Sequence, residues 1–174
     1  TDPAATIVAQ LRLPRTLLAA SMGAVLALCG AVSQGLFRNP LADPSLIGVT
    51  GGATLGAAAA MALGAAALPA LPVLTVVSLG AFAGGVAAVL LVYRLATDST
   101  GTSVATMLLA GIAITALAGA LVSLFEFYAD NTLLRRISLW KMGGLETGSR
   151  PEVLLALAVT AVLCVALPRH GSAL

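Results

Sequence analysis

Two stretches decide the fold class: Leu11-Arg12-Leu13-Pro14-Arg15, and Arg38-Asn39-Pro40-Leu41-Ala42-Asp43-Pro44. Between them lies a run of apolar and small residues, near the ~20 that a bilayer requires of a helix. The second stretch is a sharp break that contains two prolines, and another apolar run begins almost at once. A soluble core rarely needs this arrangement. It is typical of a polytopic membrane protein that docks something at its surface.

Composition excludes several classes of protein. Of the 174 residues, 59% are hydrophobic and 9% are charged, with a mean hydropathy of +1.04, whereas a soluble domain carries about 25% charged residues. So little polar surface could not cover a globule, and the bilayer is the natural solvent. The net charge of +2 is too small and scattered to indicate nucleic acid. Abundant alanine and glycine with few aromatics favours packed helices over a barrel.

Five apolar segments are predicted to span the membrane as helices, because backbone hydrogen bonds must close within a segment in lipid. We therefore expect an all-α, polytopic transmembrane helix bundle that forms a single domain over residues 1–174. The predicted helices cover about 16–37, 46–68, 71–95, 104–129 and 151–167, with a short interfacial helix at about 132–142.

Small residues recur at every fourth position of four predicted helices. This is the pattern that lets helix backbones approach closely in a membrane. It indicates a compact bundle but does not by itself indicate transport. The positions are Gly23, Ala27, Ala31 and Gly35; Gly52, Gly56, Ala60 and Gly64; Gly80, Gly84 and Ala88; and Gly111, Thr115, Gly119 and Ser123.

Two connections carry polar residues. Residues 97–103 are mostly hydroxyls and glycine, so they either line a wet constriction or form a solvated turn. Residues 130–144 place Leu133, Leu134, Ile137 and Trp140 at helical spacing, which predicts an amphipathic helix at the membrane interface that ends at Gly143-Gly144.

No catalytic or metal-binding constellation is visible. The paired carboxylates, nucleophile–base pairs and phosphate loops of enzymes are missing, and the sole histidine, His170, has no neighbouring ligands. Cys29 and Cys164 lie in apolar runs without metal-ligand spacing, and we interpret them as small buried residues. Glu126 lies late in its helix; it is either a functional buried carboxylate or a group that reaches the interface.

Six motifs occur along the chain: Arg12-Leu13-Pro14-Arg15, Gly30 through Gln34, Arg38 through Pro44, Leu46-Ile47-Gly48, Leu108 through Ala113, and Trp140 through Gly144. Taken together, they resemble the permease of binding-protein-dependent ABC importers for iron chelates, haem and cobalamin. They occur in the same order as in the family, from Arg12 to Gly144. The sequences of residues 35–44 and 134–140 are most similar to those of haem permeases, although siderophore permeases share much of them.

The resemblance implies a function and a set of partners. The chain would move haem or another iron chelate across the bacterial inner membrane, paired with a second permease copy and served by a periplasmic binding protein. ATP and Mg²⁺ would act on separate ATP-binding subunits, so this chain would be no enzyme and would bind no cofactor or metal. The family has about ten helices, of which these match the second to sixth; we expect a fragment that does not transport alone.

The resemblance also implies site residues. Arg12 and Arg15 would face the periplasm and pair with acidic residues of the binding protein, since guanidinium groups make bidentate contacts to carboxylates; the alternative is interfacial snorkelling. A separate hypothesis concerns Arg135 and Arg136: if the cargo is haem, either cation would attract its propionates through charge-assisted hydrogen bonds, and the alternative is contact with lipid headgroups. The translocation path and cytoplasmic gate would include Ser103, Thr106, Met107, Gly111 and Thr115, of which the last three also fit a helix-packing face.

The distribution of basic residues predicts the opposite orientation of the chain in the membrane. The side of Arg12 and Arg15 also holds Arg135, Arg136, Lys141 and Arg150, whereas the opposite side holds Arg38, Arg94 and Arg169. The positive-inside rule would place the first group in the cytoplasm, and the family resemblance places it outside.

Two other classes of function stay open. An ion-coupled secondary transporter would need an intramembrane acidic or basic relay, for which only Glu126 is available. A non-transporting scaffold would need neither the arginine pair nor the polar connection at 97–103.

Overall fold

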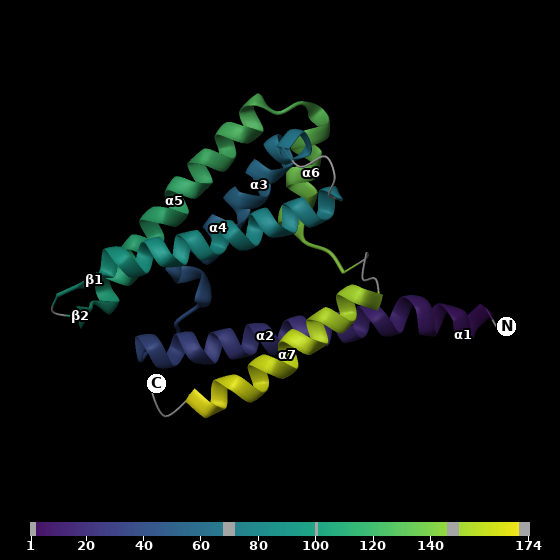
Figure 1. Cartoon of the computed structure of the whole chain (residues 1–174), viewed down its shortest axis with the longest axis horizontal. Coiled ribbons are helices and arrows are strands. Elements are labelled where there is room, and N and C mark those ends of the chain that lie inside the picture. The colour runs from purple at the N-terminus through teal and green to yellow at the C-terminus, as the bar shows by residue number, and fades with distance from the viewer. Residues whose placement is uncertain (1–2, 68–71, 100, 146–149, 171–174) are drawn as a thin grey trace. The chain divides into compact units, whose positions relative to one another are not determined.

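The computed structural model describes residues 3–67, 72–99, 101–145 and 150–170, and these are almost entirely helical (Figure 1). The predicted all-α membrane bundle is confirmed. The elements are α1 (Pro3–Ile7), a π-helical turn (Val8–Arg12), α2 (Leu13–Phe37), a 3-10 turn (Pro44–Ile47), α3 (Val49–Ala67), α4 (Val73–Ala96), β1 (Thr97–Asp98), β2 (Gly101–Thr102), α5 (Val104–Tyr128), α6 (Asn131–Met142) and α7 (Arg150–His170).

Three described helical runs are long and apolar enough to cross a bilayer: Ala4–Phe37, Val73–Ala96 and Val104–Tyr128. At 1.5 Å per residue, the 25 residues of α5 reach about 37 Å, more than the ~30 Å of the hydrocarbon layer. The apolar stretches Val49–Leu63 and Pro151–Leu167 are shorter. Observed helix ends fall within three residues of the predicted ones, except that the first helical run begins at Pro3 rather than near residue 16.

The chain divides into two compact units, residues 1–43 with 144–174, and residues 44–143. In the first unit, α1, the π turn and α2 form one continuous helical run, and α7 packs along α2. Pro14 explains the π turn, because proline has no N–H to donate and its ring collides with the carbonyl four residues earlier. The wider turn relieves that collision, with the Leu13 N–H donating to Val8 O.

The predicted break after α2 is a capped turn. Arg38 adopts the left-handed conformation, with φ of 48°, and its N–H donates to Gly35 O at 3.2 Å. The Asn39 N–H donates to Gln34 O at 3.1 Å, and the Asn39 side chain accepts from the Leu41 N–H at 2.9 Å. Pro40 and Pro44 then prevent the helix from continuing.

In the second unit, α3 and α4 form the closest helix pair. A Cβ added at Gly52 or Gly56 would collide with the backbone of Gly84 or Gly80, and the collisions are reciprocal. Only glycine lets the two backbones meet in this way, as the small-residue pattern predicts. The pattern is not used everywhere: a Cβ at Gly23 of α2 would meet nothing within 4 Å. The side-chain surroundings of Gly64 lie outside the described residues.

Helix α6 packs on α3 and α5 through one buried side chain. Ile137 is 1% exposed and clusters with Ala58 and Val122, flanked by partly buried Leu55, Met61, Phe125 and Leu133. Leu134, which the sequence grouped with the apolar face, is instead exposed.

The two cysteines depart from prediction, because Cys29 and Cys164 are both exposed free thiols rather than buried residues. The side chains of Arg150, Arg169 and His170 lie outside the described residues.

Candidate functional site

The two arginines predicted to dock a partner lie on one face of the first helical run. Arg12 ends the π turn and Arg15 follows in the first turn of α2, and both side chains are exposed. Their separation of three residues places them on neighbouring positions of one helical surface. The Thr16 hydroxyl donates to Arg12 O at 2.9 Å, a bond to the carbonyl four residues earlier that threonine often makes in helices. This geometry makes both guanidinium groups available, and docking itself stays a prediction.

The polar connection between α4 and α5 is a two-stranded antiparallel hairpin, in which Thr97 pairs with Thr102 and Asp98 with Gly101. The Thr97 and Thr102 hydroxyls lie 2.9 Å apart. Ser103 caps α5, because its hydroxyl accepts from the Thr106 N–H at 3.3 Å and from the Thr106 hydroxyl at 3.0 Å. The two hydroxyls predicted to gate a pathway are therefore engaged with each other at the start of α5.

Further along α5, the predicted pathway residues separate into two groups. Met107 and Gly111 are buried, and a Cβ at Gly111 would collide with Leu46 O in the 3-10 turn. Gly111 is therefore a position of close packing in this unit. Thr115 lies on the same face one turn later and lines an open groove.

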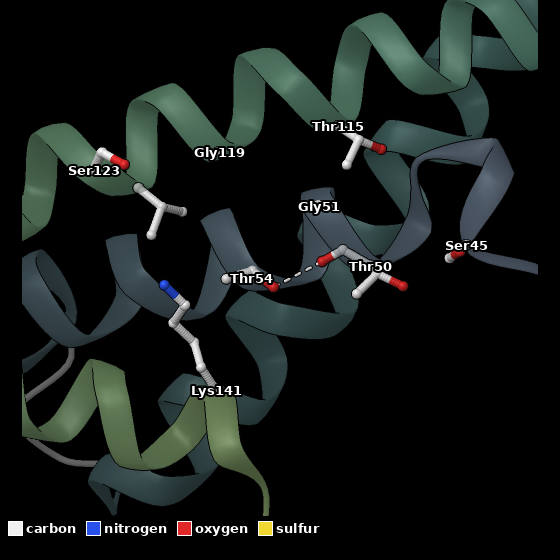
Figure 2. Close-up of a pocket in the computed structure, with 9 residues that line it drawn as sticks. Ser45, Thr50, Gly51, Thr54, Thr115, Gly119, Ser123 and Lys141 are labelled. Carbon is white, nitrogen blue, oxygen red and sulfur yellow. Dashed lines mark hydrogen bonds between the residues drawn. The ribbon is translucent and has the colours of Figure 1, made fainter.

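The groove runs between α3 and α5 and has a volume of about 490 Å³ (Figure 2). We call it the hydroxyl groove, because five of its nine lining residues are serine or threonine. Its lining residues are Ser45, Thr50, Gly51, Thr54, Thr115, Gly119, Val122, Ser123 and Lys141.

The hydroxyls of the groove are not chemically equivalent. Thr54 donates to Thr50 O and Thr115 donates to Gly111 O, each at 2.8 Å, so these two hydroxyls present only lone pairs to the groove. Within the described part of the chain, the hydroxyls of Thr50 and Ser123 have no hydrogen-bond partner, so each retains a proton to donate.

One end of the hydroxyl groove carries an ion pair. Lys141 reaches from α6 toward α5, as Figure 2 shows, and its Nζ lies 3.0 Å from Glu126 Oε1. The lysine side chain is 45% exposed and the glutamate side chain is 25% exposed. Glu126 therefore has a cationic partner on α6, which neither of the two interpretations of this residue anticipated.

The other predicted cations lie on exposed positions of α6. Arg135 and Arg136 are both exposed, on a helix whose start is fixed by Asp130. The Asp130 carboxylate accepts from the Leu133 N–H at 2.7 Å and from the Thr132 hydroxyl at 2.9 Å. These hydrogen bonds, with a smaller contribution from the charge of Arg136, lower the pKa of Asp130 below its ordinary value. The helix ends at Gly143, with φ of 71°.

Sequence reasoning missed most of the hydroxyl groove. Thr50 and Thr54 drew no attention, and Ser123 was grouped with close-packing residues because it continues the spacing of Gly111. The available signal was two pairs of hydroxyl residues, each on one helical face: Thr50 and Thr54 are four residues apart, and Thr115 and Ser123 are eight residues apart. Glu126 and Lys141 lie fifteen residues apart across a helix break, so no local pattern connects them.

A second, apolar groove lies on another face of α3 and α4, with Trp140 of α6 at its margin. Within the described residues, no three or more His, Cys, Asp or Glu side chains gather where a metal ion could be held.

The fold and the hydroxyl groove define a polytopic, all-helical membrane protein with a polar groove between apolar helices. The chain belongs to the FecCD transport family, which matches residues 1–174. The family resemblance drawn from the motifs is thereby confirmed.

Individual relatives agree with this placement. The chain is 43% identical over 161 residues to a cobalamin import system permease protein of Halobacterium salinarum, covering 92% of this chain and 42% of that protein. It is 41% identical over 155 residues to a hemin transport system permease protein of Yersinia pestis, covering 89% and 45%. A solved structure described as a metal-chelate type ABC transporter in an inward-facing conformation matches with a TM-score of 0.81 and 30% identity, over 98% of this chain and 52% of that one. The chain thus spans about half the length of these relatives.

Proposed function

We propose that this chain forms part of the membrane-spanning permease of a binding-protein-dependent ABC importer. The permease moves haem or another iron chelate across the bacterial inner membrane, with energy from a separate ATPase subunit. One observation carries the proposal: the whole chain matches the FecCD transport family, and its described helices include three long enough to cross a bilayer.

The cargo is the finer part of the proposal. The cobalamin and hemin permeases are similar to this chain at 43% and 41% identity, so identity does not separate the two cargoes. Haem is favoured here because the sequences of residues 35–44 and 134–140 resemble those of haem permeases. It is also favoured by Arg135 and Arg136, which can attract propionates through charge-assisted hydrogen bonds. A cobalamin or ferric siderophore permease of the same family is the alternative.

The secondary-transporter hypothesis has little support. It requires a relay of acidic or basic groups within the membrane, and its only candidate, Glu126, lies at the C-terminal end of α5 in an ion pair with Lys141 of α6. Family membership also favours coupling to an ATPase over coupling to an ion gradient.

The test uses the full-length permease assembled with its ATP-binding subunits. ATP hydrolysis is measured with binding protein loaded with haem, a ferric siderophore or cobalamin. We expect haem-loaded binding protein to stimulate hydrolysis most. Stimulation by none of the three would contradict the importer assignment, and stimulation by cobalamin alone would reassign the cargo.

Docking by Arg12 and Arg15 is tested in the same assay. Replacing both by glutamate should abolish stimulation while leaving basal hydrolysis intact, because like charges would then face the acidic partner. Replacing both by lysine should retain part of the stimulation, since charge remains but the bidentate fork is lost. Unchanged stimulation in the glutamate variant would remove the docking role.

The contact of Arg135 with the cargo is tested separately. An Arg135→Ala variant should slow haem uptake by the complete transporter but leave uptake of an uncharged analogue unaffected. A normal rate of haem uptake would contradict a cargo contact and favour contact of Arg135 with lipid headgroups.

A further inference from the structure

The hydroxyl groove contains one cation with unused hydrogen-bonding capacity. An ammonium group has three N–H donors, and within the described residues the only partner of Lys141 is Glu126 Oε1, at 3.0 Å. The side chain is 45% exposed and projects into the groove (Figure 2). Two donors of Lys141 therefore remain available to a ligand in the groove.

The surroundings of Lys141 suit an oxyanion. Ser123 lies on α5 three residues before Glu126, on the same helical surface, and its hydroxyl retains a proton to donate. Gly119, one turn earlier, leaves open space, because a Cβ there would meet nothing within 4 Å. The groove end thus offers an ammonium group, a hydroxyl donor and room for an incoming group.

The ion pair is not needed to hold α6 in place. That helix is fixed by Ile137, which is 1% exposed, by the Asp130 cap at its start and by Gly143 at its end. A partly exposed lysine–carboxylate pair contributes little to stability. Glu126 has a different consequence: it competes with any other anion for Lys141 and holds the ammonium group at the mouth of the groove.

We propose that the Lys141–Ser123 end of the hydroxyl groove binds an oxyanion, a carboxylate or a phosphate, which takes over the ammonium group from Glu126. Two sources carry this chemistry: an anionic group of the cargo, such as a haem propionate, and the phosphate of a lipid headgroup. The inference rests on the proposed function only in naming cargo as one source. It adds to Arg135 and Arg136 a third cation that lies inside a groove rather than on an exposed helix face.

The test exploits the opposite roles of the two charged residues. If Lys141 binds the anion, Lys141→Met weakens binding about tenfold or more, whereas Glu126→Gln strengthens it about threefold because the competitor is removed. If the pair is only a clamp between α5 and α6, both variants break the same contact and change binding in the same direction. Lys141→Arg keeps the charge and should bind within about twofold of the parent.

Two arms of the experiment distinguish the sources. In the first, the full-length permease with its ATP-binding subunits, in phosphatidylcholine nanodiscs, is titrated with haem and with haem dimethyl ester, which lacks the carboxylates. In the second, cargo-free complexes in nanodiscs with or without phosphatidylglycerol are analysed by native mass spectrometry for retained anionic lipid. The matched control is Arg94→Met, which removes an exposed cation from the last turn of α4.

A cargo site is supported if the affinity for haem falls in Lys141→Met and rises in Glu126→Gln, and if the affinity for the ester changes in neither variant. A headgroup site is supported if Lys141→Met retains less anionic lipid than the parent and Glu126→Gln retains more. Shifts of the same sign in both arms, or none beyond those of Arg94→Met, overturn the proposal. The lipid arm needs no transport activity, so the importer assignment can fail while the oxyanion site stands. If Lys141→Met misfolds, the other two variants decide: the proposal expects near-parental binding by Lys141→Arg and tighter binding by Glu126→Gln, and weaker binding by Glu126→Gln would overturn it.

Discussion

Two adjacent glycines of α4 should respond in opposite ways to the same substitution. A Cβ at Gly84 would collide with Gly52 O and lie 3.0 Å from Gly56 Cα, which are backbone atoms that cannot rotate away. A Cβ at Gly85 would lie 3.4 Å from Val49 Cγ2 and 3.5 Å from Val49 O, an ordinary van der Waals contact.

The expected magnitudes follow from two opposing terms. Replacing glycine by alanine inside a helix gains about 1 kcal/mol of helix propensity at either position. At Gly84 the added methyl forces α3 and α4 apart, and overpacking of this kind costs about 3 kcal/mol when the obstacle is backbone. Gly84→Ala should therefore lower the free energy of unfolding by about 2 kcal/mol, whereas Gly85→Ala should raise it by up to about 1 kcal/mol.

The measurement is reversible unfolding of the chain in detergent micelles by added sodium dodecyl sulfate, followed by circular dichroism and by the fluorescence of Trp140. Because the two glycines are neighbours in one helix, effects of the detergent and of helix propensity cancel in the difference of about 3 kcal/mol. Equal free energies for the two variants, or a less stable Gly85→Ala, would refute the reasoning that backbone contact holds α3 against α4.

Three further predictions concern single positions. Gly111→Ala should destabilise the chain by about 1–2 kcal/mol in the same titration, because its methyl would collide with Leu46 O. Arg38→Gly should stabilise it by about 0.5 kcal/mol, because glycine adopts φ of 48° without strain; an unchanged midpoint would mean that the turn carries no strain. Asp130 has a lowered pKa, so its carboxylate stabilises α6 above its unfolded pKa of about 3.9, and this contribution is lost as the pH falls through the folded value. The protection of α6 amides against exchange, taken relative to intrinsic exchange at each pH, should therefore fall below about pH 4, and Asp130→Asn, which caps without titrating, should abolish that dependence.

The spans were predictable because a single physical constraint dominates them. In lipid, a long apolar run can satisfy its backbone only as a helix, so α4 and α5 follow from residues 73–96 and 104–128 almost directly. The start of the first helical run was harder to predict, because Pro14 ordinarily marks the first turn of a helix. Here a π turn at Val8–Arg12 accommodates the proline, and the helix continues back to Pro3.

The hydroxyl groove was not predictable because spacing does not determine how far apart two helices lie. Gly111 and Gly119 occupy equivalent places in one small-residue pattern, yet a Cβ at Gly111 would collide with backbone and one at Gly119 would meet nothing within 4 Å. The difference depends on tertiary neighbours. A pattern of small residues is thus compatible with close packing and with an open surface, and the serines and threonines among them are informative only where the helices separate.

Helix α6 closes one end of the pair formed by α3 and α5 and lines the hydroxyl groove between them. At one end of the pair the backbones are close: a Cβ at Gly51 would lie 3.0 Å from Thr115 Cα. Toward the other end, Ile137 of α6 packs with Ala58 of α3 and Val122 of α5, so a third helix joins the contact there. The same docking places Lys141, one turn beyond Ile137, at the mouth of the opening. The residue that packs against α3 and α5 and the residue that places a cation in the groove therefore belong to one short helix. Any movement of α6 would alter the packing beside the hydroxyl groove and the charge within it together.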